Sequence, residues 1–116
     1  MPLIEIRALP QPASVDVEQV LARVTQAVAA VLGNDPRGTW ATWEEIPFDR
    51  YSEGGVTVTE QSAGTHPPLV RVAGARPAEL VRPILDAVTE TLTRELGLEP
   101  DNAFVRWEEL TPDRLG

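Results

Sequence analysis

The sequence contains the same pattern twice, and this internal repeat constrains the fold more than any other feature. Residues 2–6 read PLIEI and residues 68–72 read PLVRV, so each copy opens on a proline and an apolar run. Residues 43–46 read WEEI and residues 107–110 read WEEL, so the copies also close alike. The landmarks recur 66 and 64 residues apart in the same order, which is typical of a duplicated structural unit.

The helix of the first copy is predicted from about Val17 to Leu32. Valine and leucine side chains recur there at helical spacing, which places them on one face. Asp16 is suited to cap the N-terminus, with Gln19 three residues later as in a capping box, and Gly33 is suited to end the helix.

The helix of the second copy is predicted from about Ala78 to Leu96, with Gly97 as its C-terminal stop. Pro83 falls inside this segment. A proline lacks the backbone N–H, and its ring crowds the preceding turn. The sequence therefore leaves two alternatives, a kinked helix or a helix that begins near residues 82–83.

Each copy is thus predicted to form a strand, a helix and a second strand, and such a crossover makes the two strands parallel. Two copies give an α/β (α+β) fold, in which a four-stranded mixed sheet carries both helices on one face. Residues 51–59, with two adjacent glycines, predict a turn and a short hairpin, and residues 61–68 predict the linker between the copies. We expect a single domain over residues 1–116, made of units at about 1–62 and 66–116.

The sheet face that the helices leave open is expected to carry apolar side chains. Leu3, Trp43 and Val70, or their neighbours, are the residues expected there. Because a large apolar face in water favours a partner, the sequence predicts an oligomer.

Charge and composition exclude several classes of function. The chain carries 18 acidic against 10 basic side chains, a formal net charge of −8. This balance argues against nucleic acid or an anionic membrane as a partner. No apolar run is long enough to cross a membrane, and no basic-then-apolar leader opens the chain, so we expect a soluble, cytoplasmic protein.

The residue types that are missing narrow the chemistry further. The chain has no cysteine and a single histidine, His66, which removes thiolate nucleophiles and argues against a zinc site. No metal and no other cofactor is expected. All ten basic residues are arginines, so the N-terminal amino group is the only amine in the chain.

Since the N-terminal amino group is the only amine, Pro2 is the residue of most interest for catalysis. If Met1 is removed, the Pro2 nitrogen becomes a free secondary amine at the start of an apolar strand. An α-amino group titrates at about pH 7.7–8.0 in water, and burial or a nearby arginine lowers that pKa by disfavouring the cation. Such an amine is a base or nucleophile at neutral pH. If Met1 is retained, the nitrogen is an amide and this chemistry is absent, as it is for Pro68, the acylated copy of Pro2.

An N-terminal proline, a duplicated strand–helix–strand unit and the absence of any other amine together resemble the tautomerase superfamily. The resemblance covers nearly the whole chain. The family includes 4-oxalocrotonate tautomerase, 5-carboxymethyl-2-hydroxymuconate isomerases, malonate semialdehyde decarboxylase and 3-chloroacrylic acid dehalogenases. Its double-length members form trimers. The resemblance therefore implies a homotrimer that binds a small carboxylate substrate, with Pro2 as the catalytic residue.

The resemblance also implies the other site residues. Arg76 falls where family members hold a substrate carboxylate, the alternative being a solvated loop residue. Tyr51 falls where the small members place an aromatic pocket wall, the alternative being a tyrosine packed on a turn. Trp40 stands where small members carry a second arginine, which leaves Arg106, and less strongly Arg71, as the second cation. The alternative for both is a strand arginine paired with a glutamate.

The function implied is that of a tautomerase or isomerase, which moves a proton within a small keto–enol or unsaturated carboxylic acid. One alternative is hydratase, dehalogenase or decarboxylase chemistry on a small unsaturated acid with the same proline. Another is a non-catalytic trimeric binding protein, if Met1 is retained. The dehalogenases' C-terminal carboxylate and closely paired arginines have no clear match here, which favours proton transfer.

Overall fold

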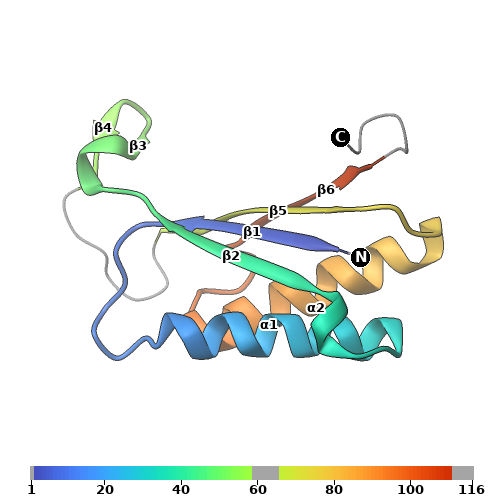
Figure 1. Ribbon diagram of the computed structural model, residues 1–116. Coiled ribbons are helices and arrows are strands. Elements are labelled where there is room, and N and C mark those ends of the chain that lie inside the picture. Colours follow the sequence, from blue (N-terminus) through green and yellow to red (C-terminus); the bar gives the residue numbers. More distant parts are fainter. Residues whose placement is uncertain (1, 59–65, 111–116) are drawn as a thin grey trace.

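The computed structural model describes residues 2–58 and 66–110, and it confirms the predicted fold class (Figure 1). A four-stranded mixed sheet carries two helices on one face, and a two-stranded antiparallel hairpin lies at one end. The sheet strands, in the spatial order β2-β1-β5-β6, are β1 (Leu3–Ala8), β2 (Trp40–Glu45), β5 (Leu69–Gly74) and β6 (Phe104–Glu109).

The strand pairing in the sheet reflects the internal repeat of the sequence. β1 and β2 are parallel, β5 and β6 are parallel, and β1 and β5 meet antiparallel in the centre. The backbone N–H of Trp40 donates to the carbonyl of Pro2 at 3.1 Å, and that of Phe104 donates to the carbonyl of Pro68 at 3.2 Å. Equivalent hydrogen bonds therefore begin both parallel pairs, and the two copies face opposite ways along the sheet.

Helix α1 (Val17–Leu32) has the predicted bounds and the predicted caps. The Asp16 carboxylate accepts a hydrogen bond from the backbone N–H of Gln19 at 3.2 Å. Gly33 ends the helix at φ 67°, a left-handed conformation that glycine adopts without steric cost.

Helix α2 (Ala78–Leu96) begins before Pro83, so the alternative of a start near residues 82–83 is wrong. Pro77 stands at the N-cap and provides no side-chain cap. Pro83 lies in the second turn and has no N–H to donate to the carbonyl of Glu79. The helix is retained because its buried side chains, from Ile84 onwards, pack on the sheet.

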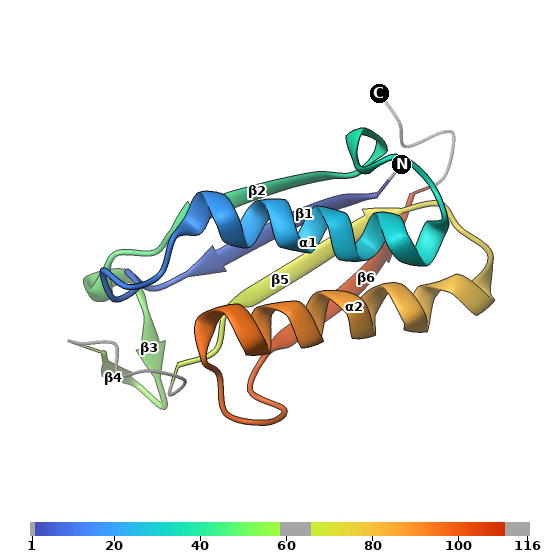
Figure 2. The same ribbon diagram turned by 90° about the horizontal axis from the view of Figure 1, so that it is seen from below.

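The core lies between the sheet and the two helices, which run side by side beneath it (Figure 2). The strands contribute buried aliphatic side chains from their helix-facing positions, and the helices contribute those of one stripe each. These residues are Ile4, Ile6, Val70, Val72, Val20, Val24, Val28, Ile84, Val88, Leu92 and Leu96.

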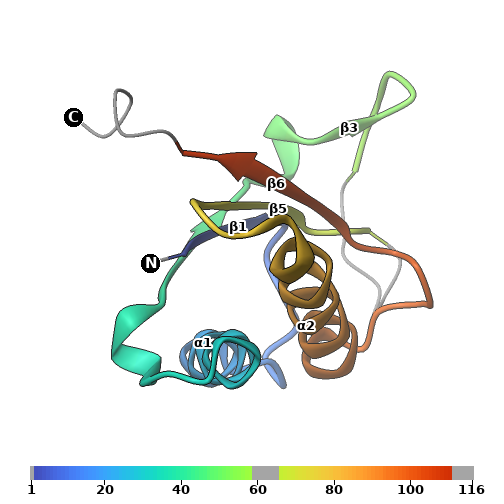
Figure 3. The ribbon, with the colours of Figure 1, turned by 90° about the vertical axis from the view of Figure 1, so that its right-hand side faces the viewer.

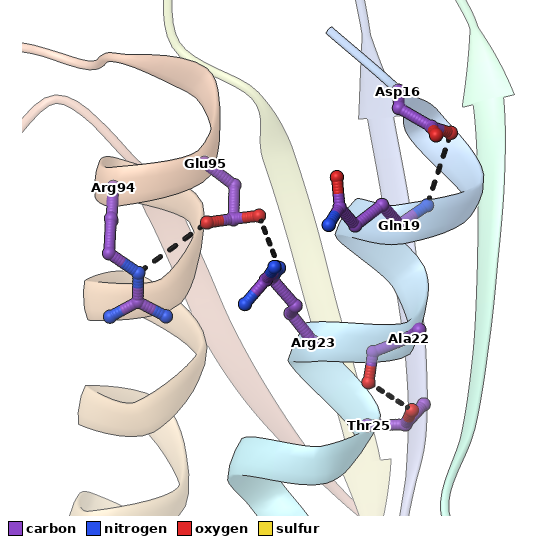
Figure 4. A network of polar contacts seen from close by, with 7 residues as sticks. All are labelled: Asp16, Gln19, Ala22, Arg23, Thr25, Arg94 and Glu95. Carbon is purple, nitrogen blue, oxygen red and sulfur yellow. Dashed lines mark hydrogen bonds and ion pairs between the residues drawn. The ribbon is translucent and has the colours of Figure 1, made fainter.

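The two helices are also joined by charge (Figure 4). Arg23 of α1 lies 2.9 Å from the carboxylate of Glu95 on α2, and Arg94 approaches the other oxygen of the same carboxylate at 3.5 Å. The Glu95 side chain is only 16% exposed, so the pair with Arg23 is screened less than an open surface pair.

The side chains on the open face of the sheet are not all those that were expected. Trp43 and Val70 both pair with Ile6, so they share its helix-facing side, and only Leu3 of the three named residues lies on the open face. The prediction for Trp43 and Val70 was wrong because the phase of the alternation, which a sequence leaves undetermined, depends on which face receives the helices.

Four short elements complete the described chain. They are the 3₁₀ turns η1 (Pro36–Gly38) and η2 (Phe48–Arg50) and the strands β3 (Ser52–Glu53) and β4 (Val56–Thr57). β3 and β4 form the predicted hairpin, on the side of the sheet away from the helices (Figure 3). Among the described residues, no helix is both long and apolar enough to span a bilayer.

Candidate active site

Pro2 lies directly before β1 and is fully buried. Because Leu3 pairs with Ala73, Pro2 comes level with Gly74, the last residue of the antiparallel neighbour β5. β1 and β2 begin at this end of the sheet, and β5 and β6 finish there. Pro2 is therefore buried where the ends of all four strands of the sheet meet. Met1 lies outside the described residues.

Arg76 lies two residues after β5, which ends at Gly74 beside Pro2, so it lies at the same end of the sheet as Pro2. Its side chain is half-buried, and its Nε is buried without a hydrogen-bond partner in the described part of the chain. A buried donor without a partner is costly, since it has lost water and gained nothing in return. The guanidinium is thus left available for an acceptor that comes from elsewhere.

Trp40 is the third predicted residue at this end. It begins β2, its backbone N–H is bonded to Pro2, and its side chain is 54% exposed on the open face. The fold therefore brings Pro2, Arg76 and Trp40 to one end of the sheet. Together they provide a buried proline directly before β1, a guanidinium cation and an exposed aromatic side chain.

Tyr51 lies at the opposite end of the sheet, where β2 has ended and η2 leads into the hairpin. Its hydroxyl donates to the Glu53 carboxylate at 3.1 Å, and His66 lies 2.7 Å from the same oxygen. Burial, with further contributions from the hydrogen bond and the charge of Glu53, raises the pKa of Tyr51 to about 12. Tyr51 is thus a neutral phenol near pH 7, held beside the hairpin.

The two strand arginines differ from each other. Arg71 donates to the carboxylates of Glu5 and Glu108 and so ties together β1, β5 and β6. For Arg71 the alternative of a glutamate pair is confirmed. Arg106 lies level with Arg71 on β6, exposed, and forms no ion pair with any described residue. It is two strands away from β1 and level with Glu5 rather than with Pro2.

Two adjacent grooves mark the surface of the described chain, of about 470 and 590 Å³. Both are lined by Arg7, Leu69 and Phe104, and one also by Arg106, the other by Tyr51. Neither includes Pro2. Within one chain, the fold therefore separates the two predicted groups, with Tyr51 and Arg106 in the grooves and Pro2, Arg76 and Trp40 at the far end.

The structure adds two residues beside Pro2 that the sequence reasoning missed. Gly74 ends β5 next to Pro2, and the indole ring of Trp107 lies over Gly74. The signal available in the sequence was a mismatch in the repeat, where the second copy has Gly74 and the first has Ala8. The described residues contain no group of three or more side chains arranged to hold a metal ion.

Comparison with solved structures identifies proteins that share this fold. A structure of native fused 4-OT superposes with a TM-score of 0.78 at 20% identity, covering 98% of this chain and 91% of that one. A malonate semialdehyde decarboxylase gives 0.66 at 17% identity, over 94% and 84%. A macrophage migration inhibitory factor-like protein from Entamoeba histolytica gives 0.71 at 13% identity, over 99% and 93%. The predicted resemblance is confirmed: this chain has the β-α-β fold of tautomerase superfamily structures.

The likeness is one of fold, since the identities lie at 20% or below for these three structures. No protein-family model and no curated protein sequence matches the chain. Further fused 4-OT structures with the same fold are described as trimers, at 18% and 14% identity.

Proposed function

We propose that the protein is a tautomerase or isomerase that moves a proton within a small 2-oxo or 2-hydroxy unsaturated carboxylic acid. One observation carries the proposal. Pro2, the residue directly before the central strand β1, is buried at the same end of the sheet as Arg76, whose buried Nε lacks a partner in the described chain. The proposal places the protein in the cytoplasm and requires no cofactor.

The proposed division of roles follows from the chemistry of each group. With Met1 removed, the Pro2 amine takes a proton from one carbon or oxygen of the substrate and returns it to another. Arg76 binds the substrate carboxylate, since a guanidinium fork matches the two carboxylate oxygens. Trp40 supplies an apolar wall beside them.

Tyr51 and Arg106 enter the proposed site only from another copy of the chain, because the fold separates them from Pro2. We propose a homotrimer in which the groove of one protomer, with Tyr51 and Arg106, faces the Pro2 end of its neighbour. Arg106 would then stabilise the developing enolate oxygen. The fused 4-OT structures described as trimers support the assembly, and so do the exposed apolar side chains of Trp40 and Phe104.

The test combines a mass with an assay. Intact mass spectrometry is expected to show a chain that lacks Met1. Ketonisation of an enol arylpyruvate or of 2-hydroxymuconate, followed by ultraviolet absorbance, is expected to fall at least about 100-fold in Pro2→Ala. Pro68→Ala is the matched control, because Pro68 is equally buried and its nitrogen is acylated. Equal activity of wild type and Pro2→Ala would contradict the proposal.

A second candidate keeps the site and changes the reaction. The fold is shared with a malonate semialdehyde decarboxylase that is described as having decarboxylase and hydratase activities. In this case Pro2 would act on an unsaturated acid by addition or by activation of water. Turnover of 3-haloacrylates or acetylenic acids, without enol ketonisation, would favour this candidate, and a chain that retains Met1 would favour a non-catalytic binding protein.

A further inference from the structure

The close contact around Gly74 is the starting point. A Cβ atom at Gly74 would lie 3.2 Å from Cη2 and 3.5 Å from Cζ2 of Trp107, and 3.6 Å from Cα of Pro2. The φ angle of Gly74 lies outside the left-handed region that favours glycine. A side chain at this position would therefore be crowded by the outer edge of the Trp107 ring, which lies close to the place where that side chain would begin, as Cα of Pro2 does.

The repeat provides an internal comparison. The position equivalent to Gly74 is Ala8, which lies level with Pro68 at the other end of the sheet, and the equivalent of Trp107 is Trp43. Ala8 carries a methyl group at the position where Gly74 has no side chain. Only the end of the sheet that bears Pro2 thus combines a tryptophan with a glycine beneath it.

A second asymmetry holds the Trp107 ring in place. Its Nε1–H donates to the carboxylate of Glu109 at 3.2 Å, two residues along β6. No corresponding bond joins Trp43 to Glu45 within the described chain, although the two pairs are equivalent in the repeat. The ring of Trp107 also packs against the core, so it is constrained on two sides.

We propose that Trp107 is a positioning residue whose indole edge, seated on Gly74, excludes water from the Pro2 nitrogen and favours its neutral, reactive form. The inference rests on the proposed function, since it needs a free amine at Pro2. Desolvation disfavours the charged form of an amine, because the cation loses more hydration free energy than the neutral base. The ring shields Pro2 without itself contacting the substrate.

Charged groups at this end of the sheet also influence the protonation of the Pro2 amine. Their influence must be distinguished from the desolvation caused by the Trp107 ring. A cation near the amine, as Arg76 in the loop after β5 would be, disfavours the ammonium, and carboxylates such as Glu109 on β6 and Glu79 in the first turn of α2 would favour it. Asp35, which caps η1, and Arg37 within it neutralise each other in an ion pair of 2.8 Å. Replacement of an indole by a phenyl ring changes none of these charges.

The experiment measures the titration of the Pro2 amine by NMR of ¹⁵N-proline-labelled protein, without substrate. Trp107→Phe keeps an aromatic side chain in the core and lacks the outer ring atoms that a side chain at position 74 would meet. We expect its amine midpoint to rise by about one pH unit, the usual size of an environmental shift. The acidic limb of kcat/KM should move by the same amount. Trp43→Phe, the matched control, should leave the midpoint unchanged.

Gly74→Ala provides a second test, because its methyl group would displace the ring without removing it. We expect a rise in the same direction, and Ala8→Gly at the equivalent position should cause none. Circular dichroism confirms that each variant is folded. A processed chain whose midpoint is the same in wild type, Trp107→Phe and Gly74→Ala would overturn the inference and leave the proposed function standing. Retention of Met1, seen by intact mass, would overturn both.

Discussion

At the scale of a single residue, Arg76 differs from most other arginines of the described chain in its hydrogen bonding. Most arginines of the described chain have an obvious acidic partner, such as Glu44 for Arg7 or Glu95 for Arg23. Arg76 has a buried Nε with none. Since a buried unpaired donor costs stability, its presence is most simply explained by a partner that arrives with function.

The first prediction tests this role. Arg76→Lys keeps the positive charge and loses the planar fork, so we expect KM for the carboxylate substrate to rise by roughly 10- to 100-fold, with a smaller effect on kcat. Steady-state kinetics measure the change. Arg82→Lys is the control, because Arg82 is an exposed residue of α2 that lies 3.7 Å from Asp86. An unchanged KM in Arg76→Lys would contradict the assignment.

The second prediction concerns Tyr51, the only tyrosine in the chain. Burial and Glu53 raise the pKa of Tyr51 to about 12. The folded protein therefore holds its phenolic proton where the unfolded chain releases it, so this group costs stability as pH rises above about 10. Absorbance of the phenolate should show a single late midpoint. Glu53→Gln should move the midpoint down, and a wild-type midpoint near 10 would contradict the structure.

At the scale of the elements, α2 illustrates how tertiary packing outweighs local propensity. Pro83 stands in its second turn and Pro77 at its N-cap, and yet the helix is continuous from Ala78 to Leu96. The cost of the proline is local, since one hydrogen bond is lost. The buried stripe that includes Ile84 and Val88 offsets it against the sheet.

The third prediction follows from that cost. Pro83→Ala should raise the free energy of unfolding by about 1–3 kcal/mol, because alanine restores an N–H that can donate to the Glu79 carbonyl and removes the ring from the preceding turn. Urea denaturation measures the change. Glu90→Ala, at an exposed position later in α2, should alter stability by less than about 0.5 kcal/mol. A fall in stability for Pro83→Ala would show that the ring packs favourably.

At the scale of the whole molecule, the open face of the sheet is divided into regions. A cluster of Arg71, Glu5 and Glu108 occupies its centre. Exposed aromatic side chains lie towards its ends, with Trp40 54% exposed and Phe104 62% exposed. A charged centre between apolar ends suits an interface that specifies both register and orientation.

The fourth prediction tests this face as the subunit interface. Wild-type protein should have the mass of a trimer by light scattering after size exclusion. Phe104→Glu should shift it to monomer, because the interface would lose the apolar Phe104 side chain and would have to bury a carboxylate that prefers water. Gln26→Glu adds the same charge on the exposed side of α1 and should leave the trimer intact. A monomeric wild type, or a trimeric Phe104→Glu, would rule out this interface.

Much of the fold follows from local signals. The repeat, the caps Asp16 and Gly33 and the turn at Gly54 act over a few residues, so they can be recognised in one dimension. The face on which Trp43 lies could not be recognised in this way, because alternation defines two faces without saying which is covered. The arrangement of the site has the same limit, since Arg76 and Arg106 both belong to the second copy, and only the strand pairing decides how near each lies to Pro2.

The sequence by itself determined the duplicated unit, the boundaries of α1 and the absence of any amine other than the N-terminus, because these depend on residue types and short spacings. Only the tertiary structure decided which residues surround Pro2. The antiparallel pairing of β1 with β5 brings Gly74 level with Pro2, and the parallel pairing of β6 sets Trp107 above it. The same pairing leaves Tyr51 at the other end of the sheet. Sequence alone does not show this, because contacts between distant segments depend on strand register.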